Sequence, residues 1–452
     1  MARGPRTRAA LATIALVGAL AATACTETVQ RAATGPAPTD PAGDAVPVTA
    51  PDGAVIEGHG GEEASFGTVP DEPIAADGEP LRVGMINQED TPLGSFPELR
   101  LAVEAGIEWI NTELGGVDGR PLELDACITN FSVERSQACA QQMVADDVVA
   151  VIGGIDITSN GSIPILEQND LPYVGGIPVN LDEERSPVSF QFSGGTAGAF
   201  TAFAWYAAEE LGAEHLAVVY AEYPPIQTAA RDYGVAVAEN LGVERVDEVA
   251  FGLSTTDFLP VLSEASAGDP DAILFGAADT SCLPVMQGAR DLGITAPIFL
   301  VGACAAPSIL AEAGPAASEG RIFNVEGRIA AEAASTEGVD ADLYNLAVLK
   351  YGDGLAPAGA GTVTFRGLMN LYAVMTDLGA DDVSPEAIIE RFRDSVDVPS
   401  FNGHPYTCAT PQVPGLPALC APQQVLVEQR DGALHEISDG WVPVPEILAE
   451  HG

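Results

Sequence analysis

The chain has 452 residues, of which 65 are acidic and 19 basic, for a net charge of −46 at pH 7. Such a surface repels phosphate, so nucleic acid and anionic lipid surfaces are excluded as expected partners. Since 47% of the residues are hydrophobic, the chain still has enough apolar area to fold, and its length allows two or more lobes.

The N-terminus has the pattern of a secretory signal. Arg3, Arg6 and Arg8 precede an uncharged stretch over residues 9–24 that ends in small residues before Cys25. This stretch is shorter than the roughly 20 apolar residues of a membrane span, so it predicts a signal peptide at residues 1–24. The small residues before Cys25 resemble a bacterial lipobox, which implies a lipidated Cys25. The alternative is ordinary secretory cleavage next to an incidental cysteine.

The segment after Cys25 is rich in residues that break regular structure. Residues 26–80 contain eight prolines and eight glycines, with little apolar periodicity. We expect residues 25–80 to form a disordered linker that holds the folded part away from a membrane.

Six further cysteines fall into three groups of near neighbours along the chain. In an exported protein they predict sequential disulfides, although six cysteines allow 15 pairings. A zinc site needs clustered ligands, whereas the five histidines are scattered and no CxxC occurs, so we expect no metal. The expected pairs are Cys127 with Cys139, Cys282 with Cys304, and Cys408 with Cys420.

From Leu81 onward, strand and helix patterns alternate. Residues 81–86 form a short apolar run typical of a buried strand. Over residues 97–114, apolar residues recur every three or four positions, which predicts a helix, and Gly115 and Gly116 predict its end. Further strands are expected at residues 121–127 and 148–152, with a helix at 134–146 between them.

A second block repeats this alternation. Two successive blocks of alternating strands and helices predict an α/β protein with two doubly wound lobes. The expected helices are at residues 196–211, 228–241, 258–266 and 282–292, and the expected strands at 215–220, 244–251, 271–276 and 297–301.

Several segments, in this order and spacing, resemble one known family. It comprises the type I periplasmic binding proteins of ABC importers, in the branch of leucine/isoleucine/valine-binding and amide-binding proteins. The resemblance covers nearly all of residues 81–452. The segments that carry it are residues 102–121, 149–154, 255–258, 269–275, 289–297 and 424–432.

The resemblance implies two Rossmann-like lobes joined by three crossovers. The first lobe would comprise residues 81–193 and 323–395, and the second residues 194–322 and 396–452. The protein would be a monomeric lipoprotein on the extracytoplasmic face of the bacterial membrane. It would capture a small polar organic ligand, such as an amino acid or amide, between the lobes, and deliver it to an ABC permease without a cofactor.

The resemblance also implies where the first lobe contacts the ligand. Thr158, Ser159 and Asn160 align with the loop that grips a ligand carboxylate in amino-acid binders, and hydroxyl and N–H donors at a helix start suit an anion. These residues are also preferred helix caps, so they could simply cap the following helix. Gly176 and Ile177 are expected to complete this half of the site, or to form only a turn.

On the second lobe, Tyr223 aligns with a tyrosine that covers the ligand. Amino-acid binders carry an acidic residue near the position of Ala303, where it pairs with the ligand ammonium. Because that acid is missing here, Asp156 and Asp279 are our candidates for an ammonium or amide partner.

Enzyme signatures are missing from the sequence. It contains no GxSxG, GxxxxGK[ST], HExxH or GxGxxG pattern. We therefore expect a binding protein and not an enzyme. The alternatives are a ligand-sensing receptor module that is not coupled to transport, and an exported hydrolase.

Overall fold

The computed structural model describes residues 48–49, 55–56, 58–91, 94–276, 279–327 and 339–452. The predicted signal peptide at residues 1–24 and the predicted lipidation site Cys25 lie outside the described residues. Within these ranges, no helix combines the length and the hydropathy that a membrane span requires.

The first lobe contains a five-stranded, fully parallel sheet with the strand order β6-β5-β7-β8-β9. In the β5–β6 pair, Leu81 lies opposite Leu122. The order reverses between β5 and β7, which is the point where open α/β sheets bind ligands. The strands are β5 (Leu81–Asn87), β6 (Leu122–Ile128), β7 (Val151–Gly153), β8 (Tyr173–Val174) and β9 (Ser189–Phe190).

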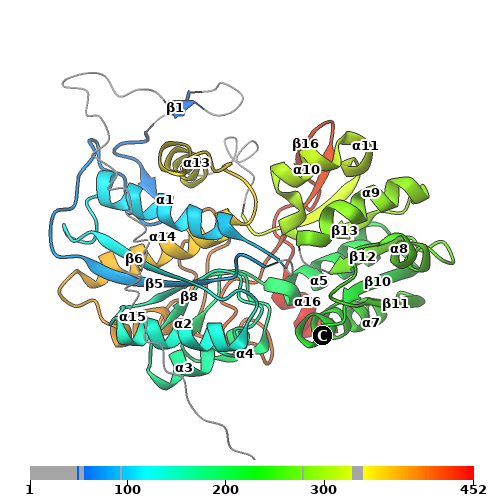
Figure 1. Ribbon diagram of the computed structural model, residues 1–452, viewed down its shortest axis with the longest axis horizontal. Coiled ribbons are helices and arrows are strands. Elements are labelled where there is room, and N and C mark those ends of the chain that lie inside the picture. The colour runs from blue at the N-terminus through cyan, green and yellow to red at the C-terminus, as the bar shows by residue number, and fades with distance from the viewer. Residues whose placement is uncertain (1–47, 50–54, 57, 92–93, 277–278, 328–338) are drawn as a thin grey trace, which may run out of the picture. The chain divides into compact units, whose positions relative to one another are not determined.

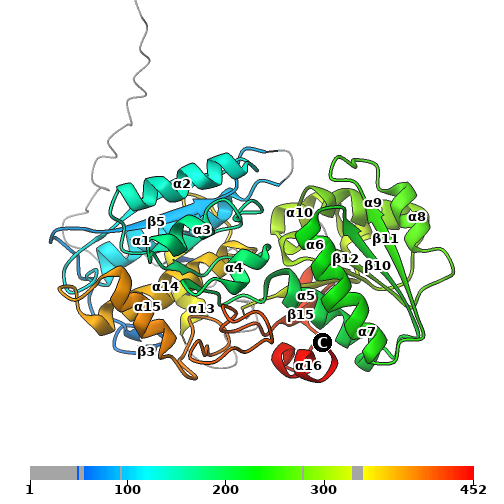
Figure 2. The same ribbon diagram turned by 90° about the horizontal axis from the view of Figure 1, so that it is seen from below.

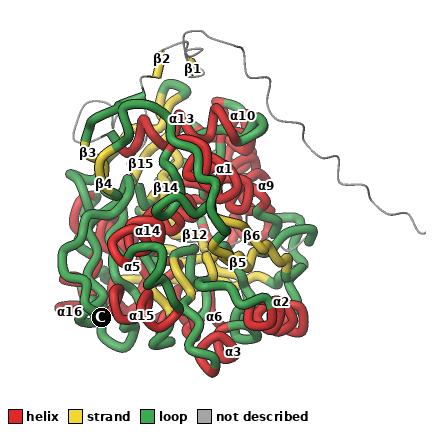
Figure 3. The backbone as a smooth tube through the Cα atoms, turned by 90° about the vertical axis from the view of Figure 1, so that its left-hand side faces the viewer, coloured by secondary structure: helices red, strands yellow, loops and turns green. Residues whose placement is uncertain are grey.

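Helices cover both faces of this sheet (Figure 3). On one side, α1 packs beside α13 and α14 (Figure 1), and on the other side α2 packs with α3. Short α4 and α15 complete the lobe. The helices are α1 (Pro97–Glu113), α2 (Val133–Ala145), α3 (Ile163–Gln168), α4 (Leu181–Arg185), α13 (Asp340–Tyr351), α14 (Gly361–Leu378) and α15 (Pro385–Arg393).

The sequence of α1 explains both its packing and its end. Leu99, Val103, Ile107 and Ile110 lie on one face and are buried in the core. The helix stops before Gly116, which has a φ of 63°, and a Cβ at this position would lie 2.2 Å from the Arg120 carbonyl oxygen. Only glycine therefore fits this turn without strain.

The second lobe contains a seven-stranded sheet with the order β11-β10-β12-β13-β14-β15-β16. Its first five strands are parallel, and β15 and β16 extend it as antiparallel strands. The strands are β10 (His215–Ala221), β11 (Arg245–Phe251), β12 (Ala272–Gly276), β13 (Ile298–Leu300), β14 (Arg321–Val325), β15 (Val425–Arg430) and β16 (Ala433–Glu436).

Two groups of helices cover this second sheet. The helices α8 and α9 pack together, while α7 and α16 pack beside α5 (Figures 1 and 2). The helical segments are α5 (Gly195–Trp205), η1 (Tyr206–Glu210), α6 (Pro224–Ala229), η2 (Ala230–Val235), α7 (Ala236–Asn240), α8 (Leu259–Ala265), η3 (Asp279–Ser281), α9 (Cys282–Leu292), η4 (Gly302–Ala305), α10 (Pro307–Ala313), α11 (Pro315–Ser318) and α16 (Val444–His451).

These observations confirm the predicted α/β class with two doubly wound lobes. The repeated strand order also confirms that each block of the sequence forms its own sheet. The three expected disulfides are present. They link β6 to α2, the start of α9 to η4, and the two ends of the loop 408–420.

The predicted linker is wrong for residues 58–80, which pack on the first lobe. This strap contains two short strands, β3 (Glu63–Ala64) and β4 (Gly67–Thr68). The ring of Phe66 lies 5.7 Å from that of Trp109, and Val69 is buried. Apolar residues between the prolines and glycines thus bury enough surface to order the strap.

The segment 396–422 also differs from the expectation, because it packs on the first lobe rather than the second. The backbone N–H of Gln191 donates to the Ala418 carbonyl, and the N–H of Cys420 donates to the Gln191 carbonyl. Tyr406 packs against Phe192. Unpaired edge groups after β9 therefore gain partners from this late segment, and the chain enters the second lobe only at β15.

Candidate functional site

A cavity of about 350 Å³ lies where the carboxyl ends of both sheets meet the connections between the lobes. Ile155 and Ile157 follow β7, and Ile177 follows β8. From the second lobe come Ile226 of α6 and Val301, which follows β13. Ligands of open α/β sheets bind at this end of the strands, so the cavity is the candidate ligand site.

Most of the cavity wall is aliphatic. Apart from Glu326, none of the described lining residues carries a formal charge at neutral pH. This composition differs from the small polar ligand predicted from the sequence, because polar ligands need matched polar partners. The remaining apolar side chains are Phe96, Val179, Ala199, Ala303, Ala305, Val325, Pro357, Ala358, Ala360, Val363 and Leu434, and the remaining polar ones are Thr196, Asn324, Tyr344, Thr362 and Asn402.

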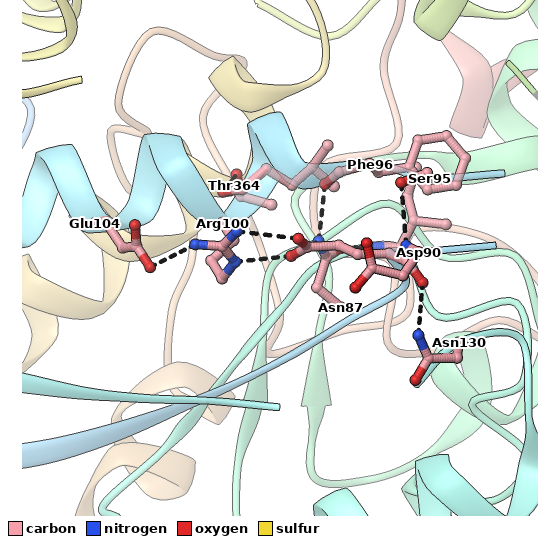
Figure 4. A network of polar contacts seen from close by, with 11 residues as sticks. Asn87, Asp90, Ser95, Phe96, Arg100, Glu104, Asn130 and Thr364 are labelled. Atoms are coloured by element: carbon pink, nitrogen blue, oxygen red, sulfur yellow. Dashed lines mark hydrogen bonds and ion pairs between the residues drawn. The ribbon is translucent and has the colours of Figure 1, made fainter. Parts of the chain in front are cut away.

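The buried Asn87 holds two of the wall residues by hydrogen bonds, and Figure 4 shows the bond to one of them, Phe96. The Nδ2 of Asn87 donates to the Phe96 carbonyl at 2.8 Å, and its Oδ1 accepts from the N–H of Ile155 at 3.1 Å. Asn87 also donates to Glu89, which the guanidinium of Arg100 binds through two nitrogens. Asn87 therefore ties the end of β5 to both the α1 and β7 sides of the cavity, a role that the sequence analysis missed.

The chain passes between the lobes three times, first near Ser193, then near Glu326 and last near Gln424, and Glu326 binds side chains of the other two connections. Its Oε1 accepts from Ser193 Oγ at 2.7 Å and from Gln424 Nε2 at 3.1 Å, so the first and third connections meet at the second. Its Oε2 lies 3.4 Å from the guanidinium of Arg366, which also donates to the Glu326 carbonyl. Burial raises the pKa of Glu326, and the Arg366 charge and these hydrogen bonds oppose the shift.

The predicted ligand residue Asp156 serves its own loop in this structure. The carboxylate is fully buried and accepts from Ser136 Oγ at 2.6 Å. It also accepts from the N–H and the hydroxyl of Thr158, at 3.0 and 2.8 Å, and from Ser162 Oγ at 3.3 Å. Burial raises the pKa of Asp156 above its ordinary value, and the hydrogen bonds from Ser136 and Thr158 oppose this shift without cancelling it. With its acceptor positions in use, Asp156 stabilises the loop and does not line the cavity.

The three predicted grip residues are likewise not among those that line the cavity. The hydroxyl of Thr158 is used by Asp156, and Ser159 Oγ accepts from Asn180 Nδ2 at 3.0 Å. Asn160 is exposed. In this arrangement the three side chains do not cap α3 either, because its N-cap is Ser162 and no side chain makes the cap hydrogen bond.

The next loop contributes one of its two predicted residues to the cavity. Ile177 lines the wall, and its N–H donates to the Gly154 carbonyl. Gly176 does not line the cavity. It has a φ of 96°, and a Cβ there would lie 2.7 Å from the Gly154 carbonyl oxygen, so glycine permits the close approach of the two loops.

Tyr223 connects the lobes beside the cavity. Its hydroxyl donates to the Ile157 carbonyl at 2.7 Å, and its ring centroid lies 6.0 Å from that of Phe131. A tyrosine is a hydrogen-bond donor at neutral pH even at its ordinary pKa, and burial raises the pKa of Tyr223 further. The other predicted residue of the second lobe, Asp279, begins η3 after β12, and its side chain lies outside the described residues.

Two buried acids on α4 lie close to the loop that follows β8. Glu183 accepts from the backbone N–H groups of Val179 and Asn180, at 2.9 and 3.1 Å. Burial raises its pKa to about 8, and burial also raises that of Glu184 to about 8. Both carboxyl groups therefore hold a proton at a pH where an exposed glutamate has lost it.

Comparison with known proteins defines the class. Residues 80–408 match the model of the family described as periplasmic binding protein, and the chain belongs to this family. Among curated proteins, none is similar enough in sequence to give a match.

Solved structures share the fold at low sequence identity. A leucine-binding protein, LivK, from Thermotoga maritima is 21% identical with a TM-score of 0.64, covering 79% of this chain and 98% of its own. A fatty acid ABC transporter substrate-binding protein from Thermomonospora curvata is 16% identical with a TM-score of 0.69, covering 88% and 97%. LivJ from Streptococcus pneumoniae, in complex with isoleucine, is 14% identical with a TM-score of 0.64, covering 79% and 99%.

Proposed function

We propose that this protein is the substrate-binding component of an ABC importer and holds its ligand in the cavity between the lobes. The observation that carries the proposal is that both sheets and the connections between them contribute to one cavity wall. A ligand that contacts both lobes favours the arrangement in which they approach each other, so an importer can recognise the occupied protein by its shape. This mechanism needs no covalent step.

The proposal includes export and attachment to the membrane. The basic N-terminus, the uncharged stretch and the small residues before Cys25 support secretion followed by lipidation of that cysteine. The ligand-bound monomer would then meet its permease at the extracytoplasmic face of the membrane. Mass spectrometry of the protein purified from membranes tests the anchor, since a lipidated Cys25 would be the first residue of the mature chain.

A cavity-blocking substitution tests the site. Ala358 is half-buried in a loop and lines the cavity, whereas nearby Ala356 is exposed and does not. We expect thermal-shift screening against amino acids, amides, carboxylates, polyamines and aliphatic compounds to find ligands. A ligand at one hundred times its Kd adds about 2.7 kcal/mol of stability. Ala358→Trp should abolish the shift, and Ala356→Trp should retain it. Equal shifts in both variants would place the ligand elsewhere.

A further inference from the structure

We propose that the ligand is an uncharged molecule with an aliphatic body rather than an amino acid zwitterion. This inference rests on the proposed function, because it concerns the same cavity. Three features carry it: the apolar wall, the compensation of the single formal charge in it, and the loss of both polar grips that a zwitterion would need.

The wall provides apolar contact from every side that the structure describes. Ile155, Ile157 and Ile177 face the ligand space from the first lobe, and Ile226 and Val301 from the second. Transfer of an aliphatic chain from water to such a surface is favourable by about 25 cal/mol for each Å² buried. A charged group placed against these five side chains loses its hydration without a partner, because none of them carries a polar atom.

The single formal charge among the described lining residues is already compensated. Glu326 is bound by Arg366, Ser193 and Gln424. An ammonium group would compete with Arg366 for this carboxylate, and a ligand carboxylate would be repelled by it. The protein's own side chains therefore neutralise and hydrogen-bond the carboxylate of Glu326, and no ligand charge is needed for this.

Helix N-termini at the cavity do not reverse this conclusion. At the N-terminus of α5, the N–H of Gly195 donates to Ser193 Oγ at 3.0 Å, and Ser193 Oγ donates in turn to Glu326. The Gly195 N–H also lowers the pKa of Glu326. The anion that this helix end attracts is thus part of the protein. At the start of α14, the N–H groups of Thr362 and Val363 donate to the carbonyls of Gly359 and Ala360. These two N–H groups at the start of α14 therefore already have backbone acceptors.

Neither grip that the resemblance implies for a zwitterion lies in the part of the cavity wall that the structure describes. Thr158 and Ser159 hydrogen-bond to Asp156 and Asn180, away from the lining. Ala303 lines the cavity with a methyl group, near the position where the resemblance implies an acid. A ligand of this cavity therefore gains from apolar contact and pays for any net or separated charge.

Four probes with related apolar chains test the inference on the purified protein: octanamide, octanoate, octylamine and leucine. In calorimetric titrations at pH 7.5, we expect octanamide to bind at least tenfold more tightly than the other three. Tightest binding of octanoate, octylamine or leucine would overturn the inference but leave the proposed function standing. If neither these probes nor any compound of the screening panel binds, the proposed function fails, and the inference fails with it.

A charge placed in the wall gives the second test. Ala303→Asp should weaken octanamide binding at least tenfold and strengthen octylamine binding. The matched control is Ala311→Asp, at an exposed position on α10 outside the cavity, which should leave both affinities within twofold. Unchanged octanamide affinity in Ala303→Asp would contradict the assignment of the ligand to this wall, and thermal unfolding of the empty variants shows that both are folded.

Discussion

The hydroxyl of Tyr223 in the second lobe donates a 2.7 Å hydrogen bond to the carbonyl of Ile157 in the first, and the Ile157 side chain lines the cavity. One bond thus joins the lobes next to the candidate ligand site. A hydrogen bond of this kind contributes about 1 kcal/mol, which corresponds to about fivefold in an equilibrium constant.

Tyr223→Phe should therefore raise the Kd of a cavity ligand about fivefold, mainly through faster dissociation in stopped-flow measurements. Tyr206 provides the control, because its hydroxyl also donates to an isoleucine carbonyl, that of Ile437, but within the second lobe. Tyr206→Phe should leave the dissociation rate unchanged. Equal rates in the two variants would show that the bond does not hold the lobes together.

Removal of the Glu326 charge should destabilise the protein strongly. Glu326→Gln leaves the guanidinium of Arg366 buried without a counter-charge, and breaking a buried pair in this way costs about 3–5 kcal/mol. The loss is measurable by urea denaturation. The exposed pair of Arg391 and Asp377 is the control, since Asp377→Asn should cost less than about 1 kcal/mol. Similar losses in both variants would mean that Arg366 finds another partner or becomes hydrated.

Stability should fall as the pH rises from about 4.5 to about 8. In this window, Glu183 and Glu184 keep their protons in the folded protein because burial raises their pKa to about 8, whereas the unfolded chain releases them. The folded state then binds more protons than the unfolded state, so the free energy of unfolding decreases with pH. Urea unfolding at intervals of pH measures the slope.

Glu183→Gln is the variant that tests this cause. The amide cannot ionise, yet it retains an oxygen that can accept from Val179 and Asn180. Its unfolding free energy should depend less steeply on pH between 5 and 8 than that of the native protein. An unchanged slope would show that Glu183 is ionised in the folded state.

Removal of one disulfide should affect stability alone, whereas removal of another should affect both stability and ligand binding. Serine in place of Cys127 and Cys139 should lower the free energy of unfolding by about 3 kcal/mol by the loop-entropy relation, while ligand affinity stays within twofold. Serine at Cys282 and Cys304 should lower stability similarly and also weaken binding, because Ala303 and Ala305 flank Cys304 in the cavity wall. Equal effects on affinity would show that the α9–η4 link does not position this wall.

Periodicity and short apolar runs predicted the two lobes because the pattern that defines each helix or strand lies within a few consecutive residues. The face of α1 and the strand β5 are examples, since their apolar spacing is visible directly in the sequence. The cysteines were predictable as well, because each partner is a near neighbour along the chain.

The site was predicted less well, because it depends on partners that are distant in sequence. Asp156 is an acid that follows a strand, but Ser136, twenty residues earlier, donates a hydrogen bond to its carboxylate. The wall residues Pro357, in the loop between α13 and α14, and Leu434, on β16, line one cavity although they come from different lobes. Nothing in the local sequence of residues 58–80 indicated the ring contacts that Phe66 makes with Trp109, Tyr372 and Phe401.

The meeting of three chain connections at Glu326 has a thermodynamic consequence. Any rotation between the lobes rearranges Ser193 and Gln424 around a carboxylate whose pKa is raised by burial. Movement and proton affinity are then coupled by linkage, so at a pH near the pKa of Glu326, ligand binding that closes the lobes exchanges a fraction of a proton with the solvent. The heat of binding should accordingly vary with the ionisation enthalpy of the buffer, even for a ligand that carries no charge.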